Sequence, residues 1–182
     1  MKNVCVFAGA AHGNNHKYGD IAYALGKLIA DHGLGLVYGG GSSGLMGRVA
    51  DGAVEYGGYL IGIIPKFLDK VEISHPGVTK LHVIDTMHQR KEMMYAESDA
   101  FIVLPGGLGT LDETMEIITW RQLDLHKKPI IIMNVMGYWD NLLALMQNVI
   151  AEGFMHDAHL DHFETVTSLD DIAGHLRQIL DS

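Results

Sequence analysis

The chain has 182 residues, of which 48% are hydrophobic, and its formal net charge is −9 at pH 7. This length suits one domain with a substantial core, predicted to span residues 1–182, and the acidic balance argues against a broad nucleic-acid-binding surface. The only cysteine, Cys5, cannot form an internal disulfide, and no apolar run approaches the roughly 20 residues of a membrane span, so we expect a cytoplasmic protein without nucleic-acid or membrane partners.

Short apolar runs alternate along the chain with segments in which apolar residues recur every three or four positions. The first pattern is typical of buried strands and the second of amphipathic helices. The predicted strands, in chain order, cover residues 3–8, 34–38, 59–64, 81–84, 100–104, 129–134 and 163–166. The predicted helices cover residues 18–32, the segment from 49 that ends at 57–58, and residues 87–98, 109–123, 139–152 and 168–180, with Ser168 as a cap.

This alternation predicts right-handed crossovers and a parallel sheet with helices on both faces. The expected fold class is therefore α/β, doubly wound. Ligands of such sheets bind beyond the carboxyl ends of the strands. Two glycine-rich turns, residues 39–47 and 105–109, follow predicted strands and are expected at that edge.

The segment 100–113 reads as a buried strand, a glycine turn and the start of a helix. Glycines allow a tight turn that brings backbone N–H groups close to a ligand, and the helix N-terminus adds partial positive charge, so the segment favours a phosphate. Glu113 would repel a phosphate unless it faces another part of the same ligand, which suggests catalysis. The alternative is that Asp112 and Glu113 only stabilise the helix dipole.

The earlier glycine segment, from Gly39 to Gly44, matches the dinucleotide pattern GxGxxG, but no acidic residue ends the next predicted strand. Leu45 and Met46 argue against a P-loop, because they stand where a lysine and a hydroxyl residue are needed. The pattern therefore indicates a simpler phosphate site. Arg90 and Lys91 lie upstream of the key turn and either grip the nucleotide or belong to a solvated helix face.

Three spaced motifs, residues 37–47, 87–91 and 105–113, closely resemble the LOG family of cytokinin-activating nucleoside 5'-monophosphate phosphoribohydrolases. The resemblance runs from Val4 to about Phe154. It implies a Rossmann-like fold, usually a homodimer, that cleaves the N-glycosidic bond of AMP or an N6-substituted AMP. The expected products are the free base and ribose 5-phosphate, and no metal or organic cofactor is implied.

Carried onto this sequence, the resemblance places the catalytic arginine at Arg90 and the catalytic glutamate at Glu113. We expect Glu113 to hold the ribose and assist water, and Arg90 to orient the nucleotide. Ala10 and Ala11 depart from the hydroxyl residues common in the family's first loop, which bears on base preference. The implied substrate- and phosphate-binding residues are Gly40, Gly41, Ser42, Gly44, Met87, Lys91, Pro105, Gly106, Gly107, Gly109 and Thr110.

Three other interpretations stay open. A non-catalytic nucleotide or cofactor carrier could share the fold, because fold alone does not fix function. Lysine decarboxylase chemistry, a label attached to this family, would need pyridoxal phosphate on a lysine, and none of the lysines lies in an evident cofactor motif. His156, His159 and His162 could bind zinc, but a solvated polar loop is the favoured reading.

Met115, Ile118 and Trp120 are expected mainly in the core, with a protruding part available to pair two subunits.

Overall fold

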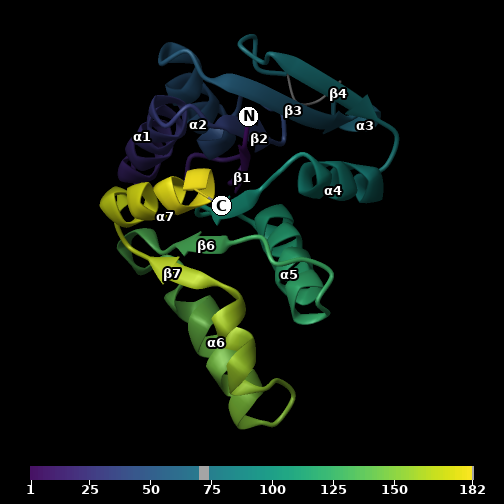
Figure 1. Ribbon diagram of the computed structural model, residues 1–182, viewed down its shortest axis with the longest axis vertical. Helices are drawn as coiled ribbons and strands as arrows, with labels where there is room; N and C mark the ends of the chain where they lie inside the picture. Colours follow the sequence, from purple (N-terminus) through teal and green to yellow (C-terminus); the bar gives the residue numbers. More distant parts are fainter. Residues whose placement is uncertain (70–73, 182) are drawn as a thin grey trace.

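A computed structural model describes residues 1–69 and 74–181, and its centre is one parallel sheet (Figure 1). The strands run in the order β4-β3-β2-β1-β5-β6-β7. Every neighbouring pair is parallel. The strands are β1 (Asn3–Phe7), β2 (Gly35–Tyr38), β3 (Tyr59–Pro65), β4 (Lys80–Ile84), β5 (Ala100–Val103), β6 (Ile130–Met133) and β7 (Glu164–Val166). The predicted parallel α/β class is confirmed.

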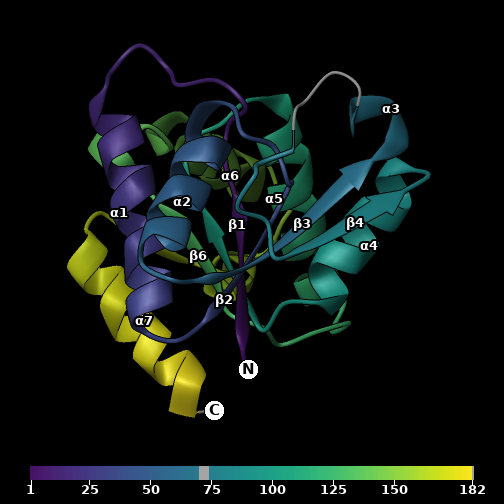
Figure 2. The same ribbon diagram turned by 90° about the horizontal axis from the view of Figure 1, so that it is seen from above.

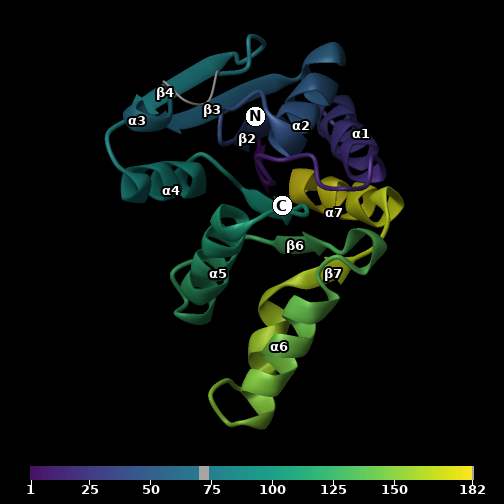
Figure 3. The same cartoon turned by 180° about the vertical axis from the view of Figure 1, so that it is seen from behind.

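Helices cover both faces of this sheet, as predicted (Figures 2 and 3). One face carries α1 (Lys17–Asp31), α2 (Gly44–Glu55) and α7 (Leu169–Asp181). The other carries α4 (Met87–Ala96), α5 (Leu108–Gln122) and α6 (Asp140–Ala151). Short helical turns form α3 (Lys66–Asp69), η1 (Val135–Gly137) and η2 (Asp157–His162). Within the described ranges, we find no helix whose length and apolarity would let it cross a bilayer.

The core lies in two layers because the central strands are buried on both sides. Along β1, Val4 and Val6 pack against the α1, α2 and α7 layer, whereas Cys5 and Phe7 pack against the opposite layer. Side chains alternate between faces along a strand, and strands covered on both faces are apolar throughout. This explains why β1 appears in the sequence as one uninterrupted apolar run.

The structure corrects some local expectations. Residues 157–162, expected as a loop, form the short helix η2, and Met136 in η1 has a left-handed φ of 52° that the sequence did not signal. The predicted cap of the last helix is confirmed, since the Asp171 N–H donates to Ser168 Oγ at 3.2 Å. Part of the irregular stretch expected between the third and fourth strands, residues 70–73, lies outside the described residues.

The strand order places β1 at the centre, with β2 on one side and β5 on the other. The chain passes from β1 to β2 on one side and from β5 to β6 on the other, so the connections after β1 and β5 leave in opposite directions. In open α/β sheets, a crevice forms at such a point, beyond the carboxyl ends of the strands. The two loops at this crevice are those that follow Phe7 and Val103.

Candidate functional site

The loops after β1 and β5 lie close enough for their backbones to form a hydrogen bond. The Gly9 N–H donates to the Pro105 carbonyl at 3.0 Å. A Cβ on Gly106 would overlap the Thr110 hydroxyl and crowd the Gly9 backbone, so this approach requires glycine. The two loops therefore form a joined rim around the crevice.

A cavity of about 200 Å³ opens beneath this rim and contains both predicted catalytic side chains. Arg90 reaches it from α4 and Glu113 from α5. Both are buried, with exposed fractions of 7% and 9%. The full lining is Ala8, Gly9, Ala10, Met46, Arg90, Gly107, Gly109, Thr110 and Glu113.

Backbone carbonyls hold the Arg90 guanidinium in place. Its Nε donates to the Ile63 carbonyl at 3.2 Å, and its Nη2 donates to the Gly39 carbonyl at 3.5 Å. A guanidinium has five N–H donors, so donors are left over for a ligand. A Cβ on Gly39 would overlap Arg90 Nη2, so a side chain at this position would displace the guanidinium from its place against the carbonyls. The first glycine segment thus shapes the site through Arg90.

Glu113 has an unusual protonation equilibrium. Burial raises the pKa of its carboxyl to about 7, although the nearby Arg90 charge acts in the opposite direction. The neighbouring Asp112 carboxylate adds to the rise. Glu113 therefore changes charge close to neutral pH, which is the property expected of a group that handles protons or stabilises a transient cation.

The N-terminus of α5 supplies backbone donors beside these two side chains. Gly107 is its N-cap and has no side chain with which to satisfy the first N–H groups. The first four N–H groups of a helix have no partner within it, and they carry partial positive charge. Gly107, Gly109 and Thr110 also line the smaller cavity. This end of α5 can therefore accept an anion next to Arg90 and Glu113.

The other glycine segment is used differently. At the start of α2, the N–H groups of Leu45 and Met46 both lie close to the Gly9 carbonyl, at 2.9 and 3.3 Å. The Gly40 carbonyl accepts from the His75 N–H at 2.9 Å. The residues that line the cavities at the crevice do not include Gly40, Gly41, Ser42 or Gly44. This segment therefore supports the site through its backbone: it donates hydrogen bonds to the β1 loop and accepts one from Arg90.

Two further predicted ligand-binding residues also lie apart from these cavities. Lys91 Nζ lies 3.1 Å from Asp112 Oδ2 and 3.0 Å from Glu116 Oε1, so it links α4 to α5. Met87 is half-buried at the first position of α4, whose start is fixed by a capping box between Thr86 and Gln89. Neither Lys91 nor Met87 is among the lining residues.

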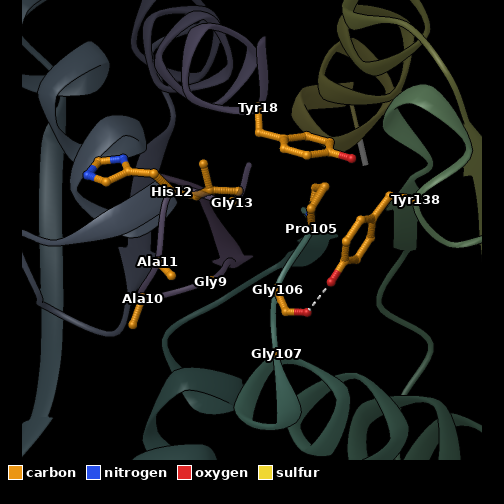
Figure 4. A pocket seen from close by; sticks show the side chains of 11 residues that line it. Gly9, Ala10, Ala11, His12, Gly13, Tyr18, Pro105, Gly106, Gly107 and Tyr138 are labelled. Atoms are coloured by element: carbon orange, nitrogen blue, oxygen red, sulfur yellow. Dashed lines mark hydrogen bonds between the residues drawn. The ribbon is translucent and has the colours of Figure 1, made fainter. Parts of the chain in front are cut away.

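A second, larger cavity of about 370 Å³ adjoins the first (Figure 4). The two share Gly9, Ala10 and Gly107. Its distinctive walls are two aromatic rings, Tyr18 and Tyr138, whose centroids lie 5.8 Å apart in an edge-to-face arrangement. The remaining lining residues are Ala11, His12, Gly13, Leu45, Pro105 and Gly106. The cavity is therefore suited to a flat or apolar group.

Sequence reasoning missed Tyr18 and Tyr138, because single aromatic residues form no motif. A usable signal was their position: Tyr18 lies at the start of the helix that follows the first strand and its loop, and Tyr138 follows the sixth strand. In the segment after α6, the His159 ring stacks on the His162 ring and meets the His156 ring edge to face, with 5.6 Å between ring centroids in both pairs. Among residues 1–69 and 74–181, no group of His, Cys, Asp or Glu side chains is arranged to hold a metal ion.

Comparisons with known proteins identify the family. A family model described as "Possible lysine decarboxylase" matches residues 46–176. A cytokinin riboside 5'-monophosphate phosphoribohydrolase from Arabidopsis thaliana is 46% identical over 155 residues, which are 85% of this chain and 73% of the relative. One from Rhodococcoides fascians is 45% identical over 158 residues, which are 86% of this chain and 80% of the relative.

Solved structures show how widely the fold is shared. The molybdenum cofactor binding protein from the phototrophic bacterium Rippkaea orientalis matches with a TM-score of 0.74 over 99% of this chain and 98% of that one. Its sequence identity is 24%, so this likeness shows the fold alone. Because the family model and the two phosphoribohydrolases match most of its length, the chain belongs to the LOG family, that of the cytokinin riboside 5'-monophosphate phosphoribohydrolases.

Proposed function

We propose that this protein hydrolyses the N-glycosidic bond of AMP or of an N6-substituted AMP, the cytokinin riboside 5'-monophosphates, and releases the free base and ribose 5-phosphate. The observation that carries the proposal is the burial of Arg90 and Glu113 in one cavity beside the uncapped start of α5. Relatives at 45–46% identity carry the name of this activity.

In this proposal the nucleotide occupies both cavities. The 5'-phosphate lies at the N–H groups of Gly107 to Thr110, where the helix dipole favours negative charge. The ribose lies between Arg90 and Glu113. The base extends toward the larger cavity, where Tyr18 and Tyr138 offer aromatic surface. Cavities of about 370 and 200 Å³ that share a wall fall together within the range typical of small-molecule sites.

The chemistry follows from the charges around the ribose. Departure of the base leaves an oxocarbenium-like sugar, and the buried Glu113, when ionised, stabilises this cation. Glu113 also positions the water that adds to the sugar carbon and accepts the proton that this water loses, while the departing base takes up a proton to leave as the free base. Arg90, held by two carbonyls, orients the nucleotide so that the bond to be broken faces the carboxylate. Neither step requires a metal or an organic cofactor.

The main alternative is a carrier that binds a nucleotide or cofactor without turnover, since proteins of that kind share the fold. Glu113 argues against it, because a buried carboxylate weakens phosphate binding and gives a pure binder no advantage. For decarboxylation through pyridoxal phosphate, a lysine is needed to hold the cofactor. The residues that the structure places around the two cavities include no lysine.

A homodimer is the assembly that we propose. The terminal strand β4 exposes Leu81 and Val83, at 40% and 43%, and edge strands with apolar side chains are normally covered. Ile118, by contrast, is only 7% exposed and belongs to the core. Light scattering should give twice the chain mass of 19.9 kDa, and Val83→Lys should lower it toward the monomer. A wild-type protein of monomer mass would contradict the proposal.

The compartment that we propose is the cytoplasm, because the one cysteine of the sequence, Cys5, is buried and forms no disulfide, as is usual for proteins of reducing compartments. Imaging a fluorescent fusion in the source cells would test this.

Turnover separates the enzyme from the carrier. The purified protein is incubated with AMP, isopentenyl-AMP and adenosine, and the products are resolved by chromatography. We expect free base and ribose 5-phosphate from the nucleotides and much slower release from adenosine, which lacks the phosphate. Binding of the nucleotides without release of base would instead support the carrier.

A further inference from the structure

The side chain of Tyr138, which lies outside the motifs, contacts the key glycine turn. The Tyr138 hydroxyl donates a hydrogen bond to the Gly106 carbonyl at 2.6 Å, drawn as a dashed line in Figure 4. Gly106 belongs to the turn between β5 and α5, whereas Tyr138 follows β6 and the short helix η1. This contact therefore ties the neighbouring loop to the turn that begins α5.

Neighbouring contacts hold Tyr138 in place, although this residue is 39% exposed. The Trp139 N–H donates to Asn134 Oδ1 at 2.7 Å, and Asn134 Nδ2 donates to Asp140 Oδ1 at 2.7 Å. The Tyr138 ring packs edge-on against Trp139 at 4.7 Å and against Tyr18 at 5.8 Å. Its hydroxyl is consequently directed at Gly106 by a braced loop.

Because the peptide bond is planar, the contact at the Gly106 carbonyl also sets the direction of the Gly107 N–H. In a planar trans peptide, C=O and N–H point in opposite directions. With the Gly106 oxygen held toward Tyr138, the Gly107 N–H points away from it, and Gly107 also lines the cavity of Arg90 and Glu113. Within residues 1–69 and 74–181, no group of the chain accepts a hydrogen bond from this N–H.

A peptide between two glycines has little of its own to fix this orientation, because glycine adopts φ angles of either sign. A flip of the Gly106–Gly107 peptide would turn the carbonyl oxygen toward the site and place a negative dipole end where an anion has to bind. A hydrogen bond to the carbonyl opposes the flip, and it also polarises the peptide so that the N–H becomes a better donor.

We propose that Tyr138 is a positioning residue that holds the Gly106–Gly107 peptide with its N–H directed at the phosphate of the bound nucleotide. The inference rests on the proposed function for the identity of the ligand. It assigns Tyr138 no role in bond cleavage.

The test compares Tyr138→Phe with Tyr56→Phe. The first removes the hydroxyl that contacts Gly106 and keeps the ring. The second removes the hydroxyl of a tyrosine at the end of α2, whose ring contacts Lys27 and which lines neither cavity. Binding of ribose 5-phosphate and of adenosine is measured by calorimetry for both variants and the wild type. Loss of one hydrogen bond predicts that Tyr138→Phe binds ribose 5-phosphate about three- to tenfold more weakly.

Three further readouts separate positioning from a general structural effect. Adenosine binding and the melting temperature should stay close to those of the wild type in both variants. With AMP, the KM of Tyr138→Phe should rise while kcat changes by less than about twofold, because the lost interaction holds substrate and transition state alike. Tyr56→Phe should bind ribose 5-phosphate as the wild type does.

Wild-type affinity of Tyr138→Phe for ribose 5-phosphate would overturn the inference, as would an equal loss in Tyr56→Phe or an equal loss of adenosine binding. A wild-type protein that does not bind ribose 5-phosphate would also overturn it. If the wild type binds the nucleotide but does not cleave AMP, the proposed function fails, while the ribose 5-phosphate titration still decides the role of Tyr138.

Discussion

Replacing Glu113 with glutamine should stabilise the folded protein at alkaline pH even as it removes catalysis. Burial raises the pKa of this carboxyl from 4.5 to about 7. The native state therefore holds the proton more tightly than the unfolded chain, and the wild type loses stability as pH rises from the unfolded value through the folded one. At 1.36 kcal/mol per pKa unit, this loss is about 3 kcal/mol.

Glutamine does not ionise, so the Glu113→Gln variant escapes this loss. The free energy of unfolding of the variant minus that of the wild type should grow by about 3 kcal/mol between pH 4 and pH 8 and change little above pH 8. Following the change with pH cancels any constant effect of the substitution on packing or hydrogen bonding. Urea unfolding at several pH values measures it, and because all seven strands belong to one sheet we expect residues 1–182 to unfold as one domain.

Glu152→Gln is the control, because Glu152 is exposed at the end of α6. Its difference from the wild type should vary far less over the same range. A Glu113→Gln difference that stays constant from pH 4 to pH 8 would refute the reasoning, since it would mean that burial does not disfavour the charged carboxylate.

Three further predictions concern the same site. If the ionised form of Glu113 is the active one, kcat/KM for AMP should rise with pH through about 7; a profile that is flat from pH 5 to pH 9 would contradict this. Arg90→Lys keeps the charge but loses the planar set of donors held by two carbonyls, and steady-state kinetics should show kcat/KM reduced by about 100-fold; near-normal kinetics would argue against an orienting role. Gly106→Ala forces a Cβ into the Thr110 hydroxyl and the Gly9 backbone, so urea unfolding should show a loss of about 2 kcal/mol; unchanged stability would mean that the rim is loosely packed.

Local patterns were sufficient to predict the strands and most helices, because each element carries its own periodicity. The order of the strands needed more. β1 lies beside β5, with Val4 paired to Ala100, and nothing local in either strand specifies a partner so far away in the sequence. The alternation of strands and helices indicated a parallel sheet, and the burial of β1 on both faces is consistent with its apolar run.

The site shows the same division between local and distant information. Arg90 and Glu113 could be selected from motifs, and the structure places both in one cavity. The segment from Gly40 to Gly44 has the local form of a phosphate loop, yet the N–H groups that follow it, those of Leu45 and Met46, contact the Gly9 carbonyl. That contact depends on how α2 meets the β1 loop, which no local pattern records. Which backbone groups bind the phosphate stays a prediction.

Product release from AMP by the wild type, Glu113→Gln and Glu152→Gln at pH 8 tests the central claim most directly. Buried Glu113 beside Arg90 predicts free adenine and ribose 5-phosphate in equal amounts from the wild type and from Glu152→Gln, and a rate at least about 100-fold lower from Glu113→Gln. Equal rates for the wild type and Glu113→Gln would contradict the assignment of the carboxylate, and absence of adenine from the wild-type reaction would contradict the proposed hydrolysis itself.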